Sequence, residues 1–106
     1  MTAYTDDMTV TIPPVRCFAH VKADKAQALK PLEEAAEAFG AWQVLQGTYA
    51  TNGQLTEYAR RMTVDECCDV IQATCNLLAA LGVTDLTDAM AACERRNQER
   101  GRYGDR

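Results

Sequence analysis

Five acidic residues in two short segments have the types and spacing of a metal site. The segments read LEEAAEAFGAW and ECCD, and their acidic residues are Glu33, Glu34, Glu37, Glu66 and Asp69. On a helix, residues three or four apart share a face, so each segment gathers its carboxylates on one side. If two such faces meet, the like charges repel one another unless a cation neutralises them. An all-oxygen site of this kind suits Mg²⁺ or Mn²⁺.

Each acidic segment also has a simpler interpretation. Acidic clusters on helices are commonly solvated surface, which would explain the three glutamates of the first segment. In the second segment, Glu66 follows Thr63 by three residues, which is the spacing of a capping box. Asp69 would then be a favourable acid in the first helical turn. Neither of these roles excludes metal binding.

The helix that must carry the first acids is expected from about residue 22 to residue 45. Apolar residues recur there at helical spacing, and Asp24 is available near the start. The residues of this stripe are Leu29, Leu32, Ala36 and Phe39. Pro31 lies inside the segment and should either kink the helix or mark its true first turn.

Two further main helices and one short helix are expected. The Thr63 capping box and Gly82 bracket a second helix, with a short helix before it through LTEYARRM. The second helix is apolar around most of its circumference, so we expect it to be buried on most sides. A third should be capped by Thr84 or Asp85 and run to about Arg100, where Gly101 ends it.

Short connections between these segments predict an all-α fold, an antiparallel helical bundle of three to four main helices. Residues 8–12, MTVTI, alternate like a strand but are stopped by two prolines, which favours a short extended N-terminal arm. We therefore expect a single domain over residues 1–106, with an arm at 1–20, a helical core at 21–101 and a tail at 102–106.

Composition narrows the class of protein. The net charge of −4 argues against binding to polymeric nucleic acid, and no apolar run is long enough for a membrane span. The polar N-terminus does not resemble a signal peptide, and an odd count of five cysteines is a poor disulfide framework. These features predict a cytoplasmic protein with reduced cysteines. Cys17 and His20 could join Cys67 or Cys68 on zinc, but a second paired ligand unit is missing.

The two acidic segments, EEAAE at 33–37 and ECCD at 66–69, together resemble the MazG-like, all-α nucleoside triphosphate pyrophosphohydrolases. The similarity continues through DVIQATCNLLAALG and ERRNQERGR and covers roughly residues 20–103. It is greatest to the small stand-alone members of bacteria and their phages. The resemblance implies a MazG-like bundle and Mg²⁺-dependent hydrolysis of a nucleoside triphosphate to the monophosphate and pyrophosphate, in nucleotide-pool house-cleaning or phage nucleotide metabolism.

The same resemblance implies roles for individual residues. Glu34, Glu37, Glu66 and Asp69 would be the Mg²⁺ ligands, with Mn²⁺ as a substitute, and Glu33 would hold or activate the attacking water. Arg96, Asn97 and Arg100 would steady the leaving pyrophosphate, although they also suit a solvated basic helix end. Trp42 could stack on a base or pack in a core, and Lys30 could contact substrate or pair with Glu34.

Surplus apolar surface on the second helix predicts an oligomer, and the resemblance implies a homo-dimer or homo-tetramer. The alternative to an enzyme is a catalytically silent helical interaction or scaffold protein that keeps the fold. Base and sugar preference have no local motif in this sequence.

Overall fold

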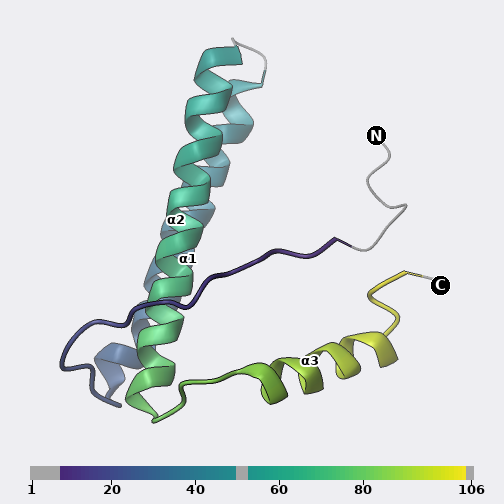
Figure 1. Cartoon of the computed structure of the whole chain (residues 1–106). Coiled ribbons are helices and arrows are strands. Elements are labelled where there is room, and N and C mark those ends of the chain that lie inside the picture. The colour runs from purple at the N-terminus through teal and green to yellow at the C-terminus, as the bar shows by residue number, and fades with distance from the viewer. Residues whose placement is uncertain (1–7, 50–52, 105–106) are drawn as a thin grey trace. The chain divides into compact units, whose positions relative to one another are not determined.

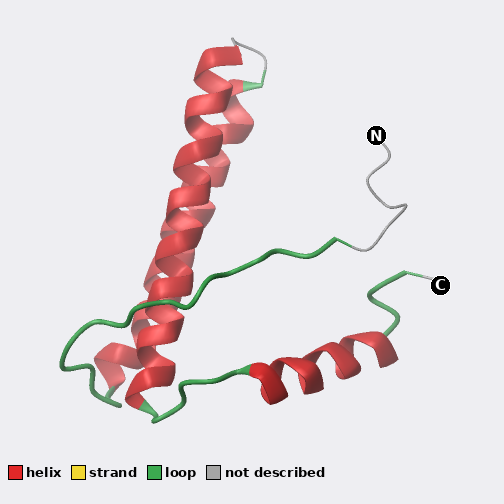
Figure 2. Cartoon of the chain, in the orientation of Figure 1, coloured by secondary structure: helices red, strands yellow, loops and turns green. Residues whose placement is uncertain are grey.

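The computed structural model describes residues 8–49 and 53–104 and places three helices in them. They are α1, Lys25–Thr48, α2, Gly53–Ala80, and α3, Thr87–Glu99 (Figure 1). The described residues include no strand (Figure 2), so the prediction of an all-α fold is confirmed. The sequence QGTYATNGQ, residues 46–54, also predicts a turn, and part of that segment lies outside the described residues.

The described residues form two compact units. Residues 15–82 make the first unit, which contains α1 and α2. Residues 8–14 and 83–104 belong to the second, which contains α3. All five acidic candidates lie in the first unit.

Asp24, which the sequence places near the start of the helix, is the N-cap of α1, and its Oδ1 accepts a hydrogen bond from Gln27 N–H at 2.9 Å. The helix starts and ends three residues later than predicted. Pro31 is its seventh residue, so it does not mark the first turn. Because proline lacks an N–H, it removes the helical bond to the carbonyl of Gln27.

Helix α2 is one continuous helix, so the prediction of a short helix followed by a capping box at Thr63 is wrong. Thr63 Oγ1 donates instead to the carbonyl of Ala59 at 2.9 Å, a bond that a threonine can make inside a helix. No glycine or proline follows Gly53 until Gly82. Gly82 ends the helix as predicted, with φ of 81° and its N–H donating to the carbonyl of Ala79 at 2.9 Å.

Helices α1 and α2 run side by side in opposite directions (Figure 1). Their less exposed residues recur at alternating steps of three and four, which defines a seam between the helices. In α1 the seam comprises Gln27, Pro31, Glu34, Ala38, Ala41, Leu45 and Thr48. In α2 it comprises Thr56, Ala59, Thr63, Glu66, Val70, Ala73, Leu77 and Ala80. Small residues fill much of this seam and permit close approach of the helices.

The apolar stripe predicted for α1 is not the face that packs on α2. Leu32 is 67% exposed and Phe39 is 57% exposed, while Leu29 and Ala36 are also classed as exposed. The prediction followed the large side chains, whereas the contact with α2 uses alanines. Helix α2 also keeps apolar surface exposed in the single chain, where Val64 is 50% exposed, so its expected burial on most sides stays a prediction for an oligomer.

The segment before α1 is fastened to α2 by two side-chain amides. The N–H of Phe18 donates to Asn76 Oδ1 at 3.0 Å, and Gln72 Nε2 donates to the carbonyl of Arg16 at 2.9 Å. Gln72 Nε2 also donates to Asn76 Oδ1 at 3.0 Å. Asn76 is only 3% exposed, so these bonds satisfy a buried acceptor and fix the path of residues 16–18.

The N-cap of helix α3 is Leu86 rather than the predicted Thr84 or Asp85. The Asp85 side chain instead forms a turn with Thr87 just before the helix. Asp85 Oδ1 accepts from the N–H and the hydroxyl of Thr87, at 2.9 and 2.7 Å, and the N-cap residue Leu86 makes no side-chain bond. These hydrogen bonds hold the pKa of Asp85 below its usual value. Gly101 follows the helix with φ of 70°, as predicted.

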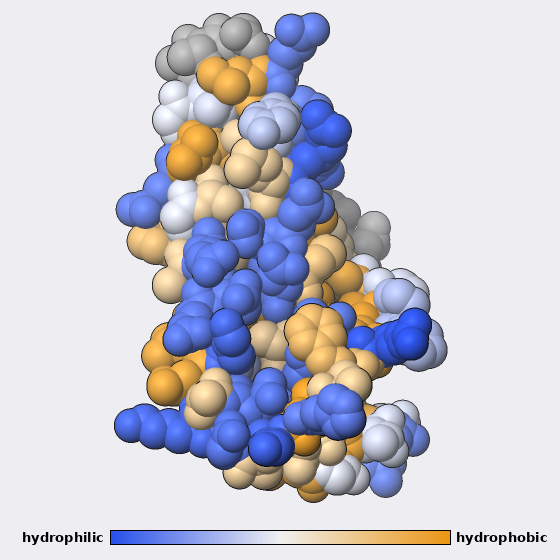
Figure 3. All heavy atoms as spheres, turned by 90° about the vertical axis from the view of Figure 1, so that its left-hand side faces the viewer, coloured by the Kyte–Doolittle hydropathy of each residue, from blue (hydrophilic) through white to orange (hydrophobic). Residues whose placement is uncertain are grey.

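Large apolar side chains reach the surface at many places in the described chain (Figure 3). None of the helices in that part of the chain combines the length and apolar character needed to cross a membrane.

Candidate acidic site and adjoining pocket

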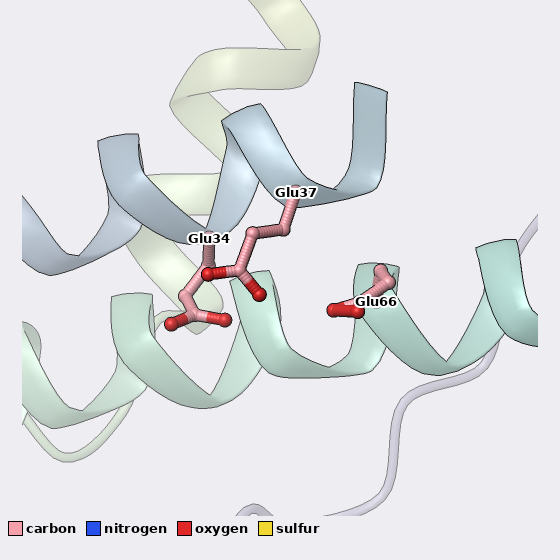
Figure 4. Close-up of side chains that lie close together, drawn as sticks. All are labelled: Glu34, Glu37 and Glu66. Atoms are coloured by element: carbon pink, nitrogen blue, oxygen red, sulfur yellow. The ribbon is translucent and has the colours of Figure 1, made fainter. Parts of the chain in front are cut away.

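Three of the five predicted acids converge between α1 and α2. Glu34 and Glu37 come from α1 and Glu66 from α2, and one carboxylate oxygen from each lies within 4.8 Å of the others (Figure 4). Among the described residues, no other group of three or more acidic, histidine or cysteine side chains is close enough to share one ion. The expected meeting of the two acidic segments is therefore present.

The helix positions of the acids explain this convergence. Glu34 and Glu66 occupy seam positions, where the flanking residues in each helix are small or apolar. Glu37 lies one turn from Glu34 beside the seam, and its side chain extends toward the other two (Figure 4). Both seam glutamates are half-buried and Glu37 is exposed. The cluster thus lies at one edge of the interface between the helices.

Glu66 has the most unfavourable environment of the three. Its Oε1 is buried and has no hydrogen-bond partner among the described residues. Burial raises the pKa of Glu66 above its usual value of 4.5, and the charges of Glu37, Asp69 and Glu34 raise it further. A cation would supply the missing partner and offset the repulsion.

Asp69 and Glu33 are not among the three converging acids. Asp69 follows Glu66 by one turn and is exposed, and its charge is one of those that raise the pKa of Glu66. Glu33 points to Lys30, with 3.4 Å between Oε1 and Nζ, and both side chains are 56% exposed. The prediction that Lys30 pairs with Glu34 is therefore wrong. Lys30 is three residues from Glu33, which is also a favourable helical spacing.

A pocket of about 490 Å³ adjoins the acids within residues 15–82. It shares Glu34 and Asp69 with the acidic region. The other lining residues are Phe18, His20, Lys22, Asp24, Ala26, Gln27, Lys30, Gln72, Ala73 and Asn76. Most of these residues were not predicted as site residues. Gln72 and Asn76, two amides four residues apart on an apolar helix, could have indicated a polar site there, because buried amides need hydrogen-bond partners.

The remaining predicted site residues lie elsewhere. Trp42 stacks on Phe39, with ring centroids 5.8 Å apart, and does not line the pocket. Arg96, Asn97 and Arg100 lie at the end of α3 in the second unit. There, Asn97 Oδ1 accepts a hydrogen bond from Arg102 at 3.1 Å. A role for these residues in substrate binding stays a prediction.

The cysteines of the described chain contain no disulfide. Cys67 and Cys68 are exposed on α2, whereas Cys17 is half-buried. The Cys17 thiol lies 3.5 Å from the carbonyl oxygen of Cys75, where it donates a weak hydrogen bond. Cys17 thus has a packing role in holding the N-terminal segment against α2.

The raised pKa of Glu66 predicts a pH-dependent stability difference between the metal-free protein and its Glu66→Gln variant. A raised pKa in the folded state means that the stability contribution of Glu66 is full below 4.5 and is lost as pH rises through the folded-state pKa. The melting temperature of the wild type should therefore fall relative to Glu66→Gln between pH 4.5 and neutral pH. Melts in chelator across this range check the result, and a constant difference would contradict it.

Comparisons with known proteins assign no family to this arrangement. The chain matches no family model, no curated protein and no solved structure.

Proposed function

We propose that the protein is a Mg²⁺-dependent nucleotide pyrophosphohydrolase with a MazG-like, all-α fold. In this reaction, water attacks a nucleoside triphosphate and yields the monophosphate and pyrophosphate. The observation that carries the proposal is the convergence of Glu34, Glu37 and Glu66 around a buried carboxylate oxygen without a partner. The order of the two acidic segments, which resembles that family, agrees with it.

The donor set fits a hard divalent cation. It consists of carboxylate oxygens, the ligands that Mg²⁺ and Mn²⁺ prefer over the nitrogen and sulfur ligands typical of zinc. Glu34, Glu37 and Glu66 would hold the ion, and Asp69, one turn from Glu66, would complete the set. When bound, Mg²⁺ would screen the charge of the phosphates and favour ionisation of the attacking water.

The residues around the acids supply the other requirements of the reaction. Glu33 is on the same helix and would accept the proton of the attacking water. Lys30, which lines the pocket and pairs with Glu33, would exchange this partner for a phosphate oxygen, and Lys22 provides a second cation in the pocket.

A panel of nucleoside triphosphates assayed for pyrophosphate release tests the proposal. We expect release from at least one of them with Mg²⁺ or Mn²⁺, loss of activity in chelator, and recovery when Mg²⁺ is restored in excess. The nucleotide product should be the monophosphate. Release of inorganic phosphate and a diphosphate would contradict the proposed position of cleavage, and no release from a panel that includes modified bases would contradict the function.

A catalytically silent interaction protein is the second candidate, favoured by the exposed apolar residues of α1. Leu32, Phe39 and Trp42 are each at least 46% exposed, and burying such a stripe is a common basis of association. The same surface suits the proposed homo-dimer or homo-tetramer of the enzyme.

Thermal melting with and without metal distinguishes the two candidates. Because an ion bound only to the folded state stabilises it by mass action, the enzyme should melt at a higher temperature in millimolar Mg²⁺ or Mn²⁺. Ca²⁺ and matched ionic strength in KCl serve as controls for selectivity and screening. A melting temperature that does not respond to Mg²⁺ or Mn²⁺ would favour the interaction protein.

A further inference from the structure

The pocket extends lengthwise along the α1–α2 pair, away from the acids. From Glu34 its lining continues toward the start of α1 and reaches Gln27, and from Asp69 it continues toward the end of α2 and reaches Asn76. Because the helices are antiparallel, both series run in the same direction (Figure 1). Seven residues of helix span about 10 Å. The pocket therefore has one end at Glu34 and Asp69 and, about this far away, a second end at Gln27 and Asn76.

The end away from Glu34 and Asp69 contains two oriented side-chain amides. Asn76 uses its oxygen to accept from Phe18 N–H and from Gln72 Nε2, and Gln72 uses its nitrogen to donate to Asn76 and to the carbonyl of Arg16. These bonds fix both amides. Within the described residues, Asn76 Nδ2 and Gln72 Oε1 are left without a partner. One free donor and one free acceptor thus belong to the pocket lining.

A donor and an acceptor in one lining complement the hydrogen-bonding edge of a nucleobase, which also carries both donors and acceptors. Phosphate offers only acceptors, so the pair does not suit a polyphosphate chain. Phe18 adds an aromatic ring to the same lining and is 65% exposed, which leaves its face available for stacking. The pocket volume of about 490 Å³ is within the range of small-molecule sites.

We propose that this pocket binds the nucleoside part of the substrate, with its base against Phe18 and the amides of Gln72 and Asn76, and its phosphates toward Glu34 and Asp69. The proposal rests on the proposed function and adds the residues that recognise the base. It assigns the segment before α1 to the binding site, since Phe18 is held there by Asn76.

Nucleosides without phosphate test this proposal independently of turnover. Adenosine, guanosine, cytidine and uridine are each titrated into the full ¹⁵N-labelled chain, and the side-chain amide signals of Gln72 and Asn76 are followed. At least one nucleoside should shift both signals. Phe18→Ala should weaken its binding by about tenfold, the order expected for one stacking contact. Tyr58→Ala is the matched control, because Tyr58 is exposed on α2 outside the pocket lining and should not change the affinity.

Asn76→Asp is a second variant, and it should keep residues 16–18 anchored to α2. An aspartate keeps oxygens that accept from Phe18 N–H and Gln72, but it lacks the donor, so nucleoside affinity should fall. Unmoved amide signals with all four nucleosides, or wild-type affinity in Phe18→Ala, would overturn the proposal. Pyrophosphate release with an unchanged KM in Phe18→Ala would overturn it while the proposed function stands. Nucleoside binding without pyrophosphate release would instead support the pocket and contradict the function.

Discussion

Glu66→Gln should reduce pyrophosphate release by at least about 100-fold and, at neutral pH without metal, should raise the melting temperature. The buried Oε1 of Glu66 has no partner, and the charges of Glu34 and Glu37 face its carboxylate. An amide of the same shape removes this repulsion and can donate to a neighbouring carboxylate. It also removes one charge from the cation site, so activity and metal-free stability should change in opposite directions.

The control for this variant is Glu57→Gln, the same substitution on the same helix. Glu57 is exposed and pairs with Arg60 at 3.2 Å, outside the acid cluster. Exposed pairs of this kind contribute little, so both activity and melting temperature should stay near wild-type values. If Glu66→Gln keeps wild-type turnover, or melts at a lower temperature than the metal-free wild type, the metal site has been assigned to the wrong residues.

Glu33→Gln should slow turnover by about 100-fold or more while the rise in melting temperature with Mg²⁺ persists. Glu33 is not one of the three converging acids, so its replacement leaves them intact. Glutamine preserves the shape of the side chain but does not accept a proton at neutral pH. Steady-state pyrophosphate release and metal-dependent melts of the same preparation separate the chemical step from ion binding.

Because this substitution also breaks the ion pair with Lys30, Lys30→Met is needed beside it. Loss of the lysine should mainly raise KM, since its proposed partner is a phosphate oxygen. A Glu33→Gln protein that no longer responds to Mg²⁺ would place Glu33 among the ligands. An equal loss of kcat in both variants would assign the effect to the ion pair rather than to proton transfer.

The C-terminal ends of α2 and α3 could be predicted, because a glycine that follows a helix is a local signal in the sequence. Asp24 caps α1, and Gly82 and Gly101 follow α2 and α3 with positive φ, as their sequence positions indicated. The start of α2 was predicted incorrectly because the Thr63 hydroxyl has two possible local partners. It donates to the carbonyl of Ala59 inside the helix rather than capping a new one.

The meeting of the two acidic segments was predictable from spacing, but the face of α1 that packs on α2 was not. Large residues such as Leu32 and Phe39 indicated one face, whereas close contact with α2 uses the small residues Ala38 and Ala41. The pocket was harder to predict still, because it depends on contacts across the chain. Phe18 reaches the pocket through a bond to Asn76, 58 residues away.

The positions of Glu34 and Glu66 within the helix seam have a consequence for folding. Alanines and leucines along this seam favour closure of the hairpin, while the carboxylates favour separation at one level, so the packing there is locally frustrated. A cation bound by these carboxylates would cross-link α1 to α2 and remove the repulsion between them. Its binding energy would then add to the stability of the hairpin. Without it, the seam should open first around the acids, and backbone amides near residues 34 and 66 should exchange with solvent sooner than those near Ala59 and Leu45.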